Sequence, residues 1–290
     1  MSATQKSPTS TLQPIKDTRV RRWLTLLALQ TTGRLYKRSG TCIPISRHKI
    51  VKIQRQEDGE SSHLAEATTM QFVSAKTSLP VPKVYCTFER KGRGYIVMER
   101  IRGQMLSVVL PSLSEASKDS LFSQLRTAMD ELRALEPPSM AMQSCVGASL
   151  LDFRIAHTRG KRFGPFDSIP EFHRWLRRWC QPPLANIHWS DEEKLAIEKM
   201  IKRQDRASWP PPVFTHADLH SCNIIVQNEK LVGIIDWEFS GWYPSYWEYT
   251  SAWCTAVVAR NWRKHLEHFL DPWPEELEME ITRNDYWGQI

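Results

Sequence analysis

The sequence predicts an α+β fold of two lobes, a small β-rich N-terminal lobe and a larger, mainly helical C-terminal lobe. Three observations support this class. Extended apolar segments fill the first third of the chain, helical periodicity fills most of the remainder, and one hairpin pattern interrupts the helical part. The 290 residues are enough to bury a large core. We place the lobes at residues 18–100 and 101–290, joined near residues 98–103, and treat the Ser/Thr-rich residues 1–17 as a disordered tail.

The N-terminal lobe is predicted to consist of extended segments and one helix. Alternating polarity, two prolines and a glycine-containing turn at residues 91–94 set the limits of the segments. The extended segments are residues 34–40, 41–54, 77–89 and 95–101. The helix begins at Ser61 or Ser62, either of which can cap its N-terminus. Its apolar stripe consists of Leu64, Ala67, Phe72 and Val73.

Helical spacing dominates the C-terminal lobe. The face of the first long helix consists of Leu121, Leu125, Met129 and Leu132. Residues 139–169 are irregular, and Pro170 then opens a short helix. Ser190 and Glu193 form a capping box for the helix "DEEKLAIEKMIKRQ". A strand–turn–strand unit follows within "PPVFTHADLHSCNIIVQNEKLVGIIDWEFSGW", and residues 244–270 return to helical spacing.

Composition narrows the class of protein. The net charge of +7 permits an anionic ligand such as a nucleotide, and the two basic clusters at residues 19–23 and 173–178 are interpreted as solvated helix faces rather than a nucleic-acid surface. The six cysteines include no CxxC pair, which favours reduced thiols in the cytosol over a zinc site or a disulfide framework. No apolar run approaches the roughly 20 residues of a membrane span. We therefore expect a cytoplasmic protein with neither a membrane span nor a nucleic-acid partner.

The polar stretch "HADLHSCNI" (216–224) lies between the apolar runs "PVFT" and "IIV", as expected for a loop between two strands. Asp218 is followed five residues later by Asn223 and eighteen residues later by Asp236, which ends the apolar run "LVGII". A hairpin would return Asp236 close to Asn223. Carboxylate and amide oxygens are hard ligands that suit Mg²⁺. Each residue alone could be a turn or cap residue, but their joint spacing predicts that Asn223 and Asp236 share one magnesium ion.

Lys52 lies between two apolar residues of an extended segment, where an ammonium group needs a partner because burying an unpaired charge is costly. Glu66, fourteen residues further on in the predicted helix, can supply that partner and orient the lysine toward a phosphate. Kinases use this arrangement of a lysine, its glutamate, a catalytic aspartate and metal ligands for phosphoryl transfer. A purely structural Lys52–Glu66 ion pair is the alternative.

Several motifs resemble those of the aminoglycoside phosphotransferase/choline kinase-like family, which has a protein-kinase-like fold. "HADLHSCNI" and "IIDWEFSGW" carry the resemblance most specifically, and "TSLPVPKVY", "YIVMERIRGQML", "GPF" and "EFSGWYPSYWEY" resemble the fungal members in particular. The resemblance runs from about Leu35 to Ala256. Departures are the missing GxGxxG motif, and Ser221 and Cys222 in place of the Pro-Gly that many members carry.

The resemblance implies an ATP- and Mg²⁺-dependent phosphotransferase that phosphorylates a hydroxyl group of a small molecule. It implies Asp218 as the catalytic base and Asn223 and Asp236 as metal ligands. Lys52 would contact the nucleotide phosphates with Glu66 as its partner. Adenine would bind to main-chain groups of the segment Glu99, Arg100 and Ile101. His220 would either approach the γ-phosphate or cap the loop.

Other interpretations of the same residues remain open. A catalytically inactive, nucleotide-binding or scaffold protein could keep the fold, although the intact site residues argue against it. Protein-kinase activity is less consistent with "HAD" in place of HRD. His216 is expected to hold the loop by packing, and Glu238 to stabilise it locally. The tryptophans expected to pack in the core are Trp237, Trp242, Trp247 and Trp253. The acceptor is not identified; a polycation would prefer an acidic pocket, to which residues 271–290 could contribute.

Overall fold

The computed structural model describes residues 12–55, 62–158, 161–184, 189–255 and 261–288. An antiparallel four-stranded sheet forms the N-terminal lobe, with the strand order β1-β2-β4-β3. Its strands are β1 (Cys42–Pro44), β2 (Lys49–Arg55), β3 (Val84–Arg90) and β4 (Arg93–Glu99). In the register of the sheet, Lys52 of β2 lies opposite Cys42 and Ile96. Lys52 is therefore in the interior of the sheet and not at its edge.

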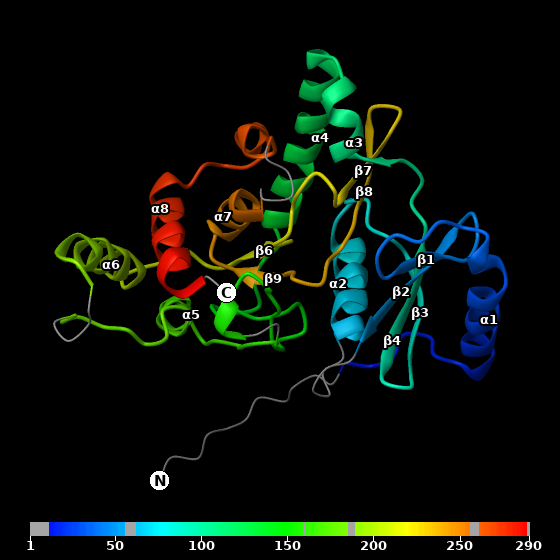
Figure 1. Ribbon diagram of the computed structural model, residues 1–290, viewed down its shortest axis with the longest axis horizontal. Helices are drawn as coiled ribbons and strands as arrows, with labels where there is room; N and C mark the ends of the chain where they lie inside the picture. The colour runs from blue at the N-terminus through cyan, green and yellow to red at the C-terminus, as the bar shows by residue number, and fades with distance from the viewer. Residues whose placement is uncertain (1–11, 56–61, 159–160, 185–188, 256–260, 289–290) are drawn as a thin grey trace, which may run out of the picture.

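Two helices flank this sheet on opposite sides, α1 (Arg19–Gln30) and α2 (Ser62–Lys76) (Figure 1). Side chains alternate along a strand, so each helix meets one face. Leu26 and Leu29 of α1 pack against the face that carries Val51 and Val97. The residues of α2 that pack with Ile96 and Met98 of β4 on the other face are Ala67, Met70 and Val73. Lys52, next to Val51, consequently points toward α2.

The prediction of a strand over residues 34–40 is wrong. A 3-10 turn (Thr32–Arg34) ends the α1 segment, Leu35 is 81% exposed, and only Ser39 forms an isolated bridge, to Cys42. The segment has no neighbouring strand because Gly40, at φ +54°, turns the chain directly into β1. The helix α1, capped by the Thr18 side chain, was not predicted.

Part of the segment predicted to be a disordered tail is bonded to the sheet. The N–H of Ile15 donates to Thr87 Oγ1 at 2.8 Å, and the N–H of Thr87 donates to Ile15 O at 2.9 Å. These hydrogen bonds hold the chain before α1 against β3 at Ile15. Residues 1–11 lie outside the described residues, and so does Ser61, one of the two expected cap residues. The helix that was predicted to begin at Ser61 or Ser62 is α2, and its described part begins at Ser62.

Three helices of the C-terminal lobe begin at a serine that caps the N-terminus. Ser114, Ser168 and Ser190 each accept a hydrogen bond from a main-chain N–H of the first turn, and the predicted capping box of Ser190 and Glu193 is present. The α-helices are α3 (Leu106–Val109), α4 (Glu115–Arg133), α5 (Ile169–Leu176), α6 (Asp191–Gln204), α7 (Trp247–Cys254) and α8 (Pro274–Arg283). Further short helical turns are Leu110–Ser112, Ala156–Thr158, Arg263–His268 and the π-turn Asn284–Gly288. The helix α8 was not predicted.

Two small sheets hold the loops that carry the predicted site. One has the order β5-β7-β8, and the other pairs β6 with β9. Their strands are β5 (Gln104–Met105), β6 (Val213–Thr215), β7 (Ile224–Gln227), β8 (Lys230–Ile234) and β9 (Gly241–Tyr243). The predicted hairpin is β7–β8, with Ile224 opposite Ile234. It places the residues that precede β7 beside those that follow β8.

One hydrophobic cluster joins the two lobes. It contains Met70 of α2, Leu125 of α4, and Phe214 and Trp237 from the strands and loops of the C-terminal lobe. The predicted core tryptophans Trp237, Trp242 and Trp247 are buried, and Trp253 is partly buried. This shared core fixes α2, and with it Glu66, against the C-terminal lobe.

The second basic cluster is not the solvated face that we expected. Residues 19–23 are exposed on α1, but His173 of α5 and Arg177, the residue that follows this helix, are fully buried. Arg177 donates to Gln204 Oε1 at 2.9 Å and forms an ion pair of 2.8 Å with Asp205. These partners at the end of the next helix offset the cost of burying its charge.

All six cysteines are free thiols. Among the described residues, no helix has both the length and the apolar character that crossing a bilayer requires.

Candidate active site

Lys52 and Glu66 form the ion pair that their positions predict. Lys52 Nζ lies 2.9 Å from Glu66 Oε2 and 3.0 Å from Oε1, and the two side chains are 7% and 1% exposed. Burial alone would lower the pKa of Lys52, but nearby carboxylates, Glu66 first, raise it well above its ordinary value. Lys52 is therefore a permanent buried cation, held on the α2 side of the sheet.

The same lysine reaches the C-terminal lobe. Lys52 Nζ lies 2.5 Å from Asp236 Oδ1 and 3.7 Å from Glu238 Oε2. Gln54, two residues along β2, donates from Nε2 to Glu66 Oε2 at 2.9 Å and to Glu238 Oε2 at 3.0 Å. These contacts connect β2, α2 and the loop after β8 into one polar cluster across the two lobes. The prediction that Glu238 stabilises only its own loop missed this contact with the N-terminal lobe.

Three carboxylates surround this single ammonium group. Oxygens of Glu66, Asp236 and Glu238 lie within 4.8 Å of one another, a set that could hold a metal ion. Burial raises the pKa of Glu238 to about 7 and that of Glu66 above its ordinary value, because crowded carboxylates resist ionisation in a low dielectric. A divalent cation bound beside Lys52 would favour the ionised form of these carboxylates.

The loop between β6 and β7 is held by its main chain. The buried Glu248 of α7 accepts hydrogen bonds from the N–H groups of His216 at 2.7 Å and Ala217 at 3.1 Å, and burial raises its pKa to about 7. His216 donates from Nε2 to Ile235 O at 3.0 Å and accepts at Nδ1 from the N–H of Asp218 at 3.2 Å. Burial lowers the pKa of His216 to about 4, so it stays neutral and holds the loop, as expected.

Asp218 presents a partly exposed carboxylate, with 18% of its side chain accessible. Asn223 donates from Nδ2 to Asp218 Oδ2 and to Asp218 O, both at 2.9 Å, and His220 Nε2 lies 3.6 Å from Oδ2. Burial alone would raise the pKa of Asp218. The contact with His220 and the charge of Arg154 outweigh burial and lower it, so the carboxylate is ionised at neutral pH.

The two predicted metal ligands lie on adjoining segments. The N–H of Ile235 donates to Asn223 O at 2.9 Å, which places Asp236 one residue from a direct main-chain contact with Asn223. Asp236 has φ +69°, a left-handed conformation that turns its side chain out of the strand direction and toward Lys52. Because the Nδ2 of Asn223 binds Asp218, its Oδ1 is the atom suited to ligate a cation.

The segment expected to bind adenine is partly engaged within its own lobe. The N–H of Glu99 donates to Lys83 O at 2.9 Å, and the N–H of Arg100 donates to His48 O at 3.0 Å. These bonds restrict the adenine contacts expected from Glu99, Arg100 and Ile101 to the other main-chain groups of the segment.

Arg154 is a site residue that the sequence did not reveal. Its guanidinium binds both oxygens of the fully buried Asp152, and Nη2 also donates to Ala217 O, next to Asp218. Ala217 has φ +66°, which is unfavourable for a residue with a Cβ atom and needs support from its surroundings. Arg154 comes from the irregular segment 139–169, where no periodicity or local motif could have identified it.

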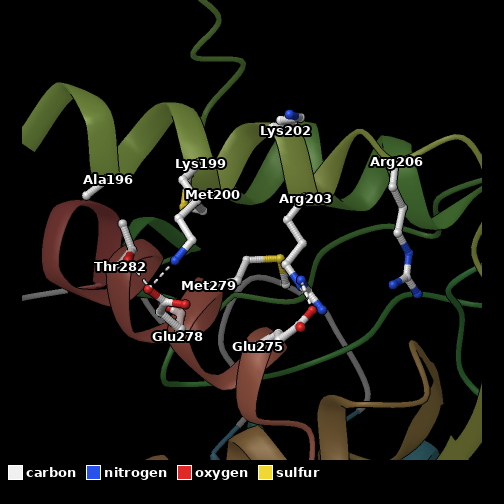
Figure 2. Close-up of a pocket in the computed structure, with 10 residues that line it drawn as sticks. All are labelled: Ala196, Lys199, Met200, Lys202, Arg203, Arg206, Glu275, Glu278, Met279 and Thr282. Carbon is white, nitrogen blue, oxygen red and sulfur yellow. Dashed lines mark hydrogen bonds and ion pairs between the residues drawn. The ribbon is translucent and has the colours of Figure 1, made fainter.

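Two hollows of the described surface differ in their relation to this cluster. A groove of about 530 Å³ between α6 and α8 is closed by ion pairs of Lys199 with Glu278, at 2.7 Å, and of Arg203 with Glu275 (Figure 2). No predicted site residue lines it, and its acids are paired, so it is not the acidic pocket considered for residues 271–290. A cleft of about 800 Å³ is lined by Gln54 and Glu238 and therefore opens at the Lys52 cluster.

Solved structures with the same fold include several aminoglycoside phosphotransferases. The gentamicin complex of APH(2")-IIa has a TM-score of 0.54 at 17% identity, over 93% of this chain and 86% of that chain. ADP-bound APH(2'')-Ib has a TM-score of 0.56 at 17% identity, over 92% and 88%. A ternary complex of APH(4)-Ia with ADP and hygromycin B has a TM-score of 0.51 at 13% identity, over 86% and 82%. These likenesses confirm the predicted bilobal, protein-kinase-like α+β fold.

A search of curated proteins found no match to this chain. The model of the phosphotransferase enzyme family, in contrast, matches residues 43–279. The match includes β2 with Lys52, α2 with Glu66, the loop with Asp218 and Asn223, and the strand end with Asp236. It covers well over half of the sequence, and we conclude that the chain belongs to the phosphotransferase enzyme family.

Proposed function

We propose that this phosphotransferase transfers the γ-phosphoryl group of ATP to a hydroxyl group of a small molecule. The observation that carries the proposal is the Lys52 cluster, in which one buried ammonium group contacts Glu66 of the N-terminal lobe at 2.9 Å and Asp236 of the C-terminal lobe at 2.5 Å. This is the pairing required to hold nucleotide phosphates and a metal ion between two lobes. The ATP and ADP complexes of the structural relatives support the choice of nucleotide.

In this proposal each residue has a distinct role. Asp218 accepts the proton of the acceptor hydroxyl while its oxygen attacks the γ-phosphorus, and the bond from that phosphorus to the β–γ bridging oxygen breaks to release ADP. Lys52, oriented by Glu66, binds the nucleotide phosphates. Asn223 Oδ1 and Asp236 would hold Mg²⁺, which neutralises phosphate charge when bound. Catalysis then rests on positioning and electrostatics.

The test compares Asp218→Asn with Asp236→Asn. Asp218→Asn keeps the shape of the loop but removes the base, so we expect Mg·ATP binding near the wild-type level and a turnover rate lower by about 10²-fold or more. Asp236→Asn removes a metal ligand and should weaken Mg·ATP binding as well. Binding is measured by calorimetry with and without Mg²⁺, and turnover by ADP release with a panel of hydroxylated acceptors.

The contrary results separate this proposal from its alternative. Wild-type turnover by Asp218→Asn would contradict the role of Asp218 as the base. Nucleotide binding that neither Mg²⁺ nor Asp236→Asn changes would contradict the metal assignment. A wild-type protein that releases no ADP with any acceptor, and whose Asp218→Asn variant differs only in thermal stability, would support a catalytically inactive nucleotide-binding protein.

A further inference from the structure

We propose that the acceptor of this phosphotransferase is an anionic hydroxylated small molecule, bearing a carboxylate or phosphate group that the arginines of the 800 Å³ cleft bind. The inference rests on the proposed function. The inference goes beyond the proposed function because it names a class of acceptor, which the charge of the cleft selects and the fold does not.

The cleft lies beside the Lys52 cluster, to which two of its lining residues belong. Gln54 and Glu238 line it, and they are bonded to each other at 3.0 Å at the edge of the Lys52 cluster. Its walls include the end of β2 and the start of β4 on one side, and Leu151, Phe153, Lys161 and Arg162 on the other. A volume of this size is typical of a small-molecule site.

The lining of the cleft is strongly basic. Among the described residues that line it, the only acid is Glu238, whose carboxylate already lies 3.7 Å from Lys52 Nζ. The cationic residues of the lining are Arg38, Arg55, Arg93, Lys161 and Arg162. An acceptor bearing several amino groups would meet unfavourable charge here, whereas a carboxylate or phosphate would be attracted.

Two of these arginines are directly opposed in the sheet. Arg55 of β2 and Arg93 of β4 are register partners, and both are exposed at the lip of the cleft. Like charges directly opposite each other destabilise a strand pair. The sheet therefore sustains an unfavourable pair at this position, and an anion bound between the two guanidinium groups would offset it.

The facing wall adds an apolar surface. Phe153 lines the cleft and is 52% exposed, with its ring edge-on to Phe239 at 5.1 Å between centroids. A large aromatic side chain held open to solvent beside arginines suits a ligand with both an anionic group and a ring or carbon skeleton.

The first experiment measures ADP release with three classes of acceptor: hydroxy acids and sugar phosphates, uncharged polyols, and aminoglycosides. We expect the anionic class to be preferred and its KM to rise with ionic strength. Preference for a neutral or cationic acceptor would overturn the inference. So would a protein that binds Mg·ATP but uses none of the anionic acceptors. A protein that does not bind Mg·ATP would instead overturn the proposed function.

The second experiment uses Arg93→Gln, with Lys91→Gln as its matched control. Lys91 is exposed in the turn of the same hairpin but neither lines the cleft nor lies opposite Arg93 in the register of the sheet. We expect Arg93→Gln to raise the KM for the anionic acceptor by about 10-fold or more, the scale of a lost charge-assisted hydrogen bond, with the affinity for Mg·ATP unchanged. Lys91→Gln should change neither quantity. Weaker Mg·ATP binding with an unchanged acceptor KM would assign the arginine to the nucleotide and contradict the inference.

A third variant tests the acids that follow Arg55 in the sequence. Glu57, Asp58 and Glu60 lie outside the described residues. The triple variant E57Q/D58N/E60Q should keep the preference for anionic acceptors. Loss of turnover in this variant would place acceptor recognition on these acids and overturn the inference.

Discussion

At the scale of the residue, the loop that carries Asp218 is held from two sides. Glu248 binds two of its main-chain N–H groups, and Arg154 binds the carbonyl of Ala217. One carboxylate therefore accepts hydrogen bonds from the N–H groups of this strained turn, and one guanidinium group donates a hydrogen bond to its carbonyl group. The proposed base is positioned by residues that lie in the sequence far from it, 64 positions before and 30 positions after Asp218.

Arg154→Gln should slow turnover by about 10-fold, because it removes a charge-assisted hydrogen bond to the loop. The positive charge of Arg154 lowers the pKa of Asp218, so its removal raises that pKa, and the acidic limb of the pH–rate profile should move to higher pH. Arg154→Lys, which keeps the charge but not the bidentate contact with Asp152, should slow turnover with a smaller displacement of the limb. An unchanged limb in Arg154→Gln would contradict the electrostatic role.

At the scale of the element, α2 approaches β4 closely at one glycine. A Cβ atom added to Gly94 would lie 2.3 Å from the ring of His63, which is 1% exposed in the first turn of α2. Neither partner can move freely, since His63 is buried between helix and sheet. The absence of a side chain at Gly94 therefore sets how closely α2, and with it Glu66, approaches Lys52.

Gly94→Ala should destabilise the fold by about 1–3 kcal/mol and weaken Mg·ATP binding, because it displaces α2 from the sheet. Gly92→Ala is the matched control. A Cβ atom there meets nothing within 4 Å, and only its φ of +66° opposes the change, so the variant should lose about 1 kcal/mol but keep nucleotide affinity. Urea unfolding and calorimetry measure the two quantities. Full nucleotide affinity in Gly94→Ala would show that the position of α2 does not control the site.

At the scale of the whole molecule, stability depends on pH through buried histidines. His173 is fully buried between Gln204 O, at 3.2 Å, and the hydroxyl of Tyr246, at 2.7 Å. Burial lowers its pKa to about 3 and that of His216 to about 4. Both groups stay neutral in the folded state, whereas the unfolded chain binds their protons below about pH 6.5.

A group with a lowered pKa in the folded state contributes stability above its unfolded pKa and loses it as the pH falls. Between pH 7 and pH 5 the buried, neutral His173 should therefore lower the free energy of unfolding by about 2 kcal/mol, at about 1.4 kcal/mol per pH unit below the unfolded pKa. His173→Gln, which cannot titrate, should lose about that much less stability than wild type over this interval, although it is less stable at pH 7. Urea midpoints at both pH values measure this, and equal losses would contradict the assignment.

The sequence alone determined the local features of the protein. The capping box of α6, the hairpin β7–β8, and the spacing of Asp218, Asn223 and Asp236 depend on residues within a few turns of one another, and periodicity and capping chemistry report such contacts. It also predicted the contact of Lys52 with Glu66, because a lysine in an apolar strand requires a nearby acid.

Only the tertiary structure decided the long-range partners. Three sets of contacts join segments that share no sequence pattern. Glu238 contacts Lys52 of the other lobe, Glu248 and Arg154 hold the loop that carries Asp218, and Arg55 lies opposite Arg93. The incorrect predictions have the same cause, because they too concern long-range partners. Residues 34–40 have the polarity of a strand but no neighbour to pair with, and Arg177 is buried because Asp205 lies beside it. Whether a polar or extended residue is satisfied depends on its spatial neighbours, and these are fixed only when the elements pack together.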